Sequence, residues 1–213
     1  NAVLLKKWGY TVPTTWAQYE SLAVTIAKAH PGYISGFTGD AYAPNRYLWA
    51  SDCPTNVQVN ATTVKINFQD PNCTRAQNML STLTAAHALS TDGIFDADAA
   101  KAGQKLVMSP GAAWWGNYLF ETTWKLPKGT MQAATGLSWP GSTTPQMGDE
   151  GGGLWGMSSH IKGKELKNAE TFMKFVSSDP AWQVQLSTGL PAFTADQQPW
   201  IAQQTSDDYY ENT

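Results

Sequence analysis

Helix signals alternate with short apolar segments along almost the whole chain. Thr15 is a good N-cap for a helix that runs to about residue 29, with Gln18 at the capping-box position. The next apolar segment, residues 33–37, has the length and composition of a buried strand. Such a succession of helices and short strands is typical of an α/β fold. The same signals predict helices at 2–8, 43–51, from Pro71, at 96–103, 164–177 and from Pro180 to Gly189, and strands within 57–68 and at 105–108 and 153–158.

Composition excludes several classes of protein. Only 15% of the 213 residues are charged, the net charge is −3, and no run of Lys and Arg exceeds two residues. A nucleic-acid-binding surface is therefore not expected. The longest apolar stretches are far shorter than the roughly 20 residues that cross a bilayer. The chain begins at Asn1 with neither an initiator Met nor a signal-peptide pattern, so we expect a piece of a longer protein.

The two cysteines, Cys53 and Cys73, lie in a stretch rich in Asn, Thr and Pro. No C-x-x-C or H-x-x-x-H pattern accompanies them, and neither has a basic neighbour that would activate a thiol. We therefore predict a disulfide, which in the chain-entropy model stabilises the protein by about 3 kcal/mol and indicates an oxidising compartment. Asn60 and Asn72 begin N-glycosylation sequons, but such triplets are common by chance.

Signatures of catalysis and of metal or cofactor binding are weak. The three histidines lie far apart, and none belongs to a metal-ligand or nucleophile motif. A formal G-x-G-x-x-G at Gly151, Gly153 and Gly156 has strand-like residues within it instead of opening a helix. The adjacent carboxylates Asp149 and Glu150 are as consistent with a solvated turn as with a contact to a polyol. We predict no catalytic residue, no metal site and no cofactor.

Aromatic residues are the most informative group, because the chain has ten tryptophans. Trp16 and Trp182 lie on amphipathic helices and are expected in the core. Others lie in Gly- and Pro-rich loops, where a flat ring can either stack on a sugar or cover the base of a loop. These loop aromatics are Trp114, Trp115, Trp139, Tyr42, Tyr47 and Trp49. The group Asp40, Tyr42, Asn45 and Arg46 adds acceptors, donors and a stacking surface within a few residues, which favours a carbohydrate ligand.

Several segments, in this order and spacing, resemble family 1 extracellular solute-binding proteins of ABC transporters, the group that includes maltose-binding protein. The likeness extends from Asn1 to about Phe193, and its Cys-containing insertion looks most like the actinobacterial sugar-binding members. The segments are LLKKWGY, VPTTWAQYESLA, GFTGDAYAPNRYLWAS, FQDPNCTRAQNML, LVMSPGAAWWGNYLF, GDEGGGLWGMSSHIKGKELKNAETFMKFVSSDPAWQVQ and STGLPAFT.

The resemblance implies a periplasmic-binding-protein-like (type II) α/β fold with two lobes, here as an incomplete chain. Residues 1–146 would form most of the second lobe, and 147–213 the crossover and an incomplete return into the first lobe. Carried over position by position, it implies ligand contacts at Asp40 and Tyr42, at Trp114 or Trp115, and at Asp149 and Glu150. Around Ala43 to Arg46 the chain departs from maltose-binding protein, which leaves the sugar unidentified.

The function that follows is capture of a sugar or oligosaccharide between two lobes and its delivery to a membrane permease. Such a protein would act as a monomer outside the cytoplasm, either lipid-anchored at the cell surface or in the periplasm. Two alternatives stay open. One is a carbohydrate hydrolase that uses Asp40, Asp149 or Glu150 as acid and base, which needs two carboxyls about 5–10 Å apart. The other is a family member adapted to a non-sugar solute.

Overall fold

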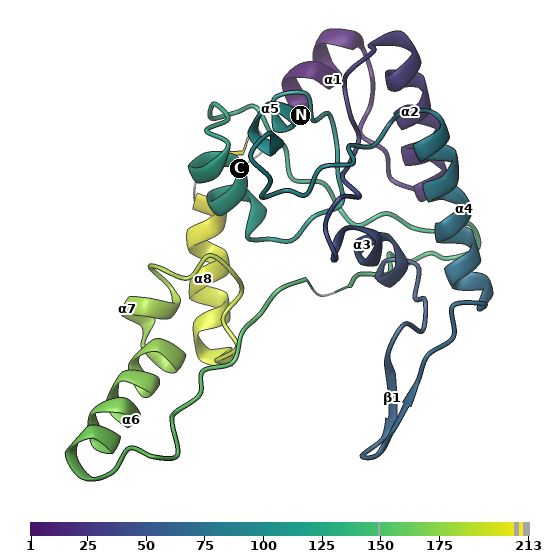
Figure 1. Ribbon diagram of the computed structural model, residues 1–213. Coiled ribbons are helices and arrows are strands. Elements are labelled where there is room, and N and C mark those ends of the chain that lie inside the picture. Colours follow the sequence, from purple (N-terminus) through teal and green to yellow (C-terminus); the bar gives the residue numbers. More distant parts are fainter. Residues whose placement is uncertain (149, 207–208, 211–213) are drawn as a thin grey trace.

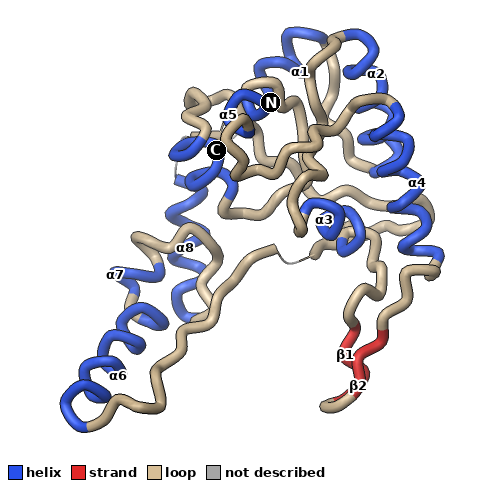
Figure 2. The backbone as a smooth tube through the Cα atoms, viewed as in Figure 1, coloured by secondary structure: helices blue, strands red, loops and turns tan. Residues whose placement is uncertain are grey.

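The computed structural model describes residues 1–148, 150–206 and 209–210 of the chain. Residues 1–148 form the larger part, which we call the main body, with α1 to α5 and a short hairpin (Figure 1). A long extended segment leaves this body and leads to a second part, the arm, which holds α6, α7 and α8 (Figure 2). Beyond α8, Tyr209 returns to the main body, because its carbonyl oxygen accepts the N–H of Gly129 at 2.8 Å.

The first two helices start and stop where capping chemistry places them. Helix α1 (Ala2–Trp8) ends at Gly9, whose φ of 72° is a left-handed conformation that glycine adopts without strain. Helix α2 (Trp16–Ala29) begins after Thr15, whose hydroxyl oxygen accepts the N–H of Gln18. The Gln18 side chain accepts the N–H of Thr14, not that of Thr15, so the expected capping box is shifted by one residue.

Three further helices complete the main body's helical part. Helix α4 (Pro71–Ala85) is capped by Asp70, as its Asp-Pro start predicts. Helices α3 (Ala43–Trp49) and α5 (Ala99–Gly103) are each slightly shorter than their predicted ranges. Helices α2 and α3 both pack against α4. The core between them holds Trp16, Tyr19, Ala23, Tyr47, Leu48, Ala50, Cys53, Cys73, Ala76, Met79, Leu83, Ala88 and Trp139.

The buried segments predicted as strands lie side by side but pair too briefly to form a sheet. Residues 33–37 contact 105–107 through the N–H of Val107, which donates to Ile34 at 2.8 Å. On its other side, the same segment pairs with residues 88–90, which the sequence signals did not single out. This three-segment layer supplies the buried Phe37, Leu106 and Val107. The strand expected at 153–158 is wrong, because every residue there is exposed and outside any ladder.

The ribbon predicted within 57–68 is present as β1 (Val57–Asn60) and β2 (Thr63–Lys65), which pair antiparallel. It projects from the main body below α3 and α4 (Figure 2), and all its residues are exposed. The predicted disulfide is confirmed: Cys53 and Cys73 are bonded, and they lie on the two segments that enter and leave this ribbon. Both cysteines are buried, so the bridge ties the ribbon's base to the core.

The part of the chain after residue 109 departs most from expectation. A π-helix, η1 (Trp115–Thr123), occupies a stretch for which no helix was predicted. Helix α6 (Gly163–Ser178) matches its prediction, but α7 (Pro180–Gln183) ends well before Gly189. Helix α8 (Thr194–Ser206) was missed because Pro199 lies inside it and argues against a helix. Within the described residues, no helix is both long and apolar enough to span a membrane.

Candidate functional site

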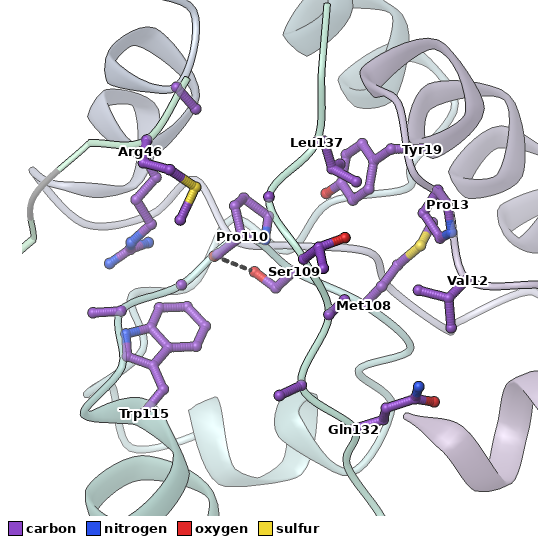
Figure 3. Close-up of a pocket in the computed structure, with 18 of the residues that line it drawn as sticks. Val12, Pro13, Tyr19, Arg46, Met108, Ser109, Pro110, Trp115, Gln132 and Leu137 are labelled. Carbon is purple, nitrogen blue, oxygen red and sulfur yellow. Dashed lines mark hydrogen bonds between the residues drawn. The ribbon is translucent and has the colours of Figure 1, made fainter. Parts of the chain in front are cut away.

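A cavity of about 450 Å³ opens in the main body, next to the layer formed by residues 33–37 and 105–107. Its walls are built by residues 107–113, by 131–137 and by the start of α2, and its lining is mainly apolar. Figure 3 shows Arg46 and Trp115 at one end, Val12 and Pro13 at the other, and Ser109 and Pro110 between them. An apolar cavity of this size with few polar groups is typical of a small-molecule site.

The polar end of the cavity is organised by Arg46, on the inner face of α3. Its side chain is only 5% exposed, and its Nε donates to a carboxylate oxygen of Glu150 at 2.7 Å. Its Nη2 lies 3.4 Å from the carboxylate of Asp40. The guanidinium carbon is 4.9 Å from the centre of the Trp115 ring, which places the cation over the ring's face. One buried guanidinium therefore joins two carboxylates and an aromatic ring.

Trp114 and Trp115 have different surroundings. Trp115 begins η1, is only 2% exposed and lines the cavity. Trp114 donates its indole N–H to the main-chain carbonyl of Glu150 at 3.2 Å. Its ring lies parallel to Phe95 with centroids 6.1 Å apart, and edge-on to Tyr118 at 6.0 Å. Phe95 and Tyr118 are both exposed, so Trp114 belongs to an outward-facing group of three rings, Phe95, Trp114 and Tyr118, which we call the aromatic patch.

Tyr42 and Asn45 do not line the cavity. Tyr42 is 61% exposed, and its main-chain N–H donates to Asp40 Oδ1 at 2.9 Å. The Asn45 amide donates to the carbonyl of Ala41, within its own turn. Asp149, the remaining predicted contact, lies outside the described residues.

The structure thus brings most of the predicted site residues into one connected group. Arg46, Trp115 and Glu150 line the cavity, Asp40 contacts Arg46, and Trp114 contacts Glu150. Sequence reasoning identified Trp115 but missed the cavity walls at 107–113 and 131–137, because apolar loop residues carry no motif. Phe95 was also missed, although an aromatic between Gly93 and Asp96 is the same kind of signal as Tyr42 near Gly39 and Asp40.

Trp49 also lines the cavity, whereas two other loop aromatics, Trp139 and Tyr47, are structural. Trp139 stacks on Trp16 with ring centroids 5.4 Å apart and donates its indole N–H to Ala50 at 2.8 Å. Tyr47 is buried, and its hydroxyl lies 3.3 Å from that of Tyr19. Burial raises the pKa of Tyr47 to about 12 and raises that of Tyr19 well above its usual range. Both phenols are therefore neutral hydrogen-bonding groups of the core.

The same geometry bears on the hydrolase hypothesis. A glycosidase needs one carboxyl to donate a proton and a second to attack the sugar or activate water. Here Asp40 and Glu150 both accept from the guanidinium of Arg46. Among the residues that the structure describes, no three His, Cys, Asp or Glu side chains gather closely enough to hold a metal ion.

Comparisons with known proteins agree with the resemblance seen in the sequence. No protein-family profile matches the chain. It is 26% identical over 197 residues to a protein named multiple sugar-binding protein from Streptococcus mutans, a match that covers 86% of this chain and 45% of the relative. The structure titled "Maltose bound T. maritima MalE3" aligns with a TM-score of 0.64 at 17% identity, covering 99% of this chain and 57% of that one.

The chain therefore spans about half the length of the proteins that it matches. Its α/β architecture has long loops between helices and short paired segments. Over almost the whole length of this chain, it agrees with the fold of that maltose-bound protein. The chain is an incomplete periplasmic-binding-protein-like (type II) fold, similar in sequence to a sugar-binding protein.

Proposed function

We propose that the protein is an extracytoplasmic solute-binding protein that captures a carbohydrate and delivers it to an ABC importer, without catalysis. The observation that carries this proposal is the cavity of about 450 Å³, with Trp115 in its wall and the Arg46 cluster at one end. The names of the similar proteins support it, since both refer to sugars as bound ligands.

The chemistry of the site suits a sugar ring. A pyranose has an apolar C–H face, which packs on aromatic rings, and a rim of hydroxyls, which need donors and acceptors. Met108, Pro110 and Trp115 supply apolar surface in the cavity, while Ser109 and Gln132 supply polar groups between apolar neighbours. The exposed rings of Tyr42, Phe95 and Tyr118 extend the apolar surface outside the cavity and would suit an oligosaccharide.

We further propose that residues 1–146 form most of a second lobe and that 147–213 cross into a first lobe. The extended segment between the main body and α6 supports this division (Figure 1). So does the burial pattern, because only Val176 is buried among the sixteen residues of α6. The large apolar side chains exposed within residues 150–206 are Leu154, Trp155, Met157, Phe172, Phe175, Leu186, Leu190, Phe193 and Ile201. They form the surface that the rest of the first lobe would cover.

Delivery to a permease follows from the same proposal. A sugar that holds two lobes together gives the membrane complex a closed shape to recognise. The disulfide between Cys53 and Cys73 supports an extracytoplasmic location, because such bonds persist in oxidising compartments. We propose that the protein acts as a monomer.

The test is a tryptophan-fluorescence titration of the protein against mono- and oligosaccharides, with amino acids, polyamines and metal chelates as non-sugar probes. Reducing-sugar release is followed in the same samples. We expect a saturable change with one class of sugar and no released product. A response only to a non-sugar probe would overturn the carbohydrate assignment, and product release would establish a hydrolase.

A further inference from the structure

We propose that Arg46 is a positioning residue: its buried guanidinium holds Asp40, Glu150 and Trp115 in place and, through Glu150, orients Trp114. This inference rests on the proposed sugar-binding function. It assigns Arg46 a role in addition to the contact with the sugar's hydroxyls that its residue type and loop position alone had favoured.

The donors of Arg46 are already engaged in two directions. Its Nε donates to Glu150 at 2.7 Å, and its Nη2 faces Asp40 at 3.4 Å. The guanidinium's flat face rests on Trp115 at 4.9 Å. Because the Arg46 and Glu150 side chains are 5% and 10% exposed, the pair is shielded from water and its geometry is fixed by these partners.

The two carboxylates pass this constraint on to the aromatic residues. The main-chain carbonyl of Glu150 accepts the indole N–H of Trp114, and the Glu150 side chain accepts from Arg46. Glu150 therefore links Arg46 to Trp114. Asp40 likewise contacts Arg46 with its carboxylate and accepts the main-chain N–H of Tyr42. Every described member of the predicted site except Asn45 is thus one or two contacts from the same guanidinium.

The backbone beside Glu150 is adapted to this arrangement. Gly151 has φ of 109°, which residues with side chains rarely adopt. A Cβ at this position would lie 3.1 Å from the Trp114 indole nitrogen. Glycine at 151 therefore lets the chain turn directly after the carbonyl that Trp114 needs, and leaves space for the indole.

The arrangement is specific for arginine. A guanidinium is planar, donates in several fixed directions and can stack on an aromatic face, whereas an ammonium is a compact charge on a flexible stem. Lysine at this position has no planar group, so it cannot hold both carboxylates in the same fixed directions while lying flat on Trp115. Arg46→Lys should therefore fall between the unchanged protein and Arg46→Met in each measurement below.

The first test needs no ligand. In protein with ¹⁵N-labelled tryptophan, Arg46→Met is expected to shift the indole N–H resonances of Trp114 and Trp115. Arg75→Met is the matched control, because Arg75 also lies over a tryptophan ring, that of Trp139 at 4.7 Å, but does not line the cavity. It should shift Trp139 and leave Trp114 unchanged. An unmoved Trp114 resonance in Arg46→Met would overturn the proposal.

The second test is a double-mutant cycle on the affinity for the tightest-binding sugar. Arg46→Met and Trp114→Phe should each raise Kd about tenfold, and the double variant should bind about as weakly as the weaker single variant. Arg75→Met should leave Kd unchanged even if it lowers the melting temperature. Multiplied effects in the double variant, or an equal loss in Arg75→Met, would contradict the inference. If the unchanged protein binds no sugar, the proposed function fails, and the indole spectra still decide the role of Arg46.

Discussion

Trp139 and Trp115 show what a residue's place in the sequence can and cannot tell. Both follow or adjoin a Gly–Pro-rich loop, and both were candidates for stacking on a sugar. In the structure both are buried: Trp139 belongs to the core beside Trp16, while Trp115 belongs to a second core cluster and also lines the cavity under Arg46. The loop context left open whether each ring stacks on a sugar or covers the base of a loop, because that depends on contacts with distant segments. Sequence order carries no direct signal for those contacts.

The buried pair Tyr19 and Tyr47 gives a prediction for alkaline pH. The pKa of Tyr47 is about 12 in the folded protein, because burial disfavours its charged form, against about 10 in the unfolded chain. The neutral phenol therefore stabilises the fold fully below pH 10, and this stabilisation is lost as pH rises from 10 to 12. The free energy of unfolding that is lost between these pH values is on the order of 3 kcal/mol.

Melting temperature measured from pH 8.5 to 11.5 should therefore fall steeply above pH 10. Tyr47→Phe removes the titrating group, so its melting temperature should start lower but fall less steeply over the same range. The exposed Tyr42 provides the control, since Tyr42→Phe should keep the steep fall of the unchanged protein. Equal slopes in Tyr47→Phe and the unchanged protein would refute this explanation.

At the scale of elements, α1 to α7 were predicted, some from start signals and others from their residue pattern, whereas η1 and α8 were not. Thr15 and Asp70 mark helix starts by hydrogen bonds within three residues, so the signal is present in the sequence itself. The π-helix η1 contains Gly116 and has no side-chain cap, and its i→i+5 pattern leaves no familiar periodicity. The paired segments at 34 and 106 depend on contacts between residues 72 positions apart, which composition predicts only as buried strand-like stretches.

Helix α2 offers a test of capping within one element. Thr15→Ala removes the oxygen that accepts the N–H of Gln18, and should lower the free energy of unfolding by about 1 kcal/mol in urea denaturation. Thr25 is the matched control: it is exposed in the interior of α2, where its hydroxyl bonds to Ser21. Thr25→Ala should be neutral or slightly stabilising, because alanine has the higher helix propensity. Equal losses for both variants would show that Thr15 does not act as a cap.

At the scale of the whole molecule, the main body and the arm differ in how much apolar surface they bury. Helix α2 buries Trp16, Tyr19, Ala23 and Ile26, whereas α6, which is slightly longer, buries only Val176. The sequence predicted α6 well, because its amphipathic pattern is local. It could not show which residues cover the apolar face, since those partners need not be near in the chain.

Hydrogen exchange of the 213-residue chain should report this difference. We expect the amides of α6 to exchange at least about tenfold faster than those of α2 and α4, because few buried contacts oppose local opening. Peptides from α2 and α4, which each bury four residues, serve as internal references in the same experiment. Protection of α6 equal to that of α2 would mean that the arm is stable without a covering lobe.

The central claim is that a sugar binds beside Arg46, against Trp115 and the aromatic patch. The most direct measurement is a sugar titration of the protein with ¹⁵N-labelled tryptophan, followed by its assigned indole N–H resonances. The account predicts saturable shifts at Trp114 and Trp115, while Trp8, which stacks on His30 away from the cavity, stays unchanged. Saturable sugar binding that leaves Trp114 and Trp115 unmoved, or no shift with any sugar, would contradict it.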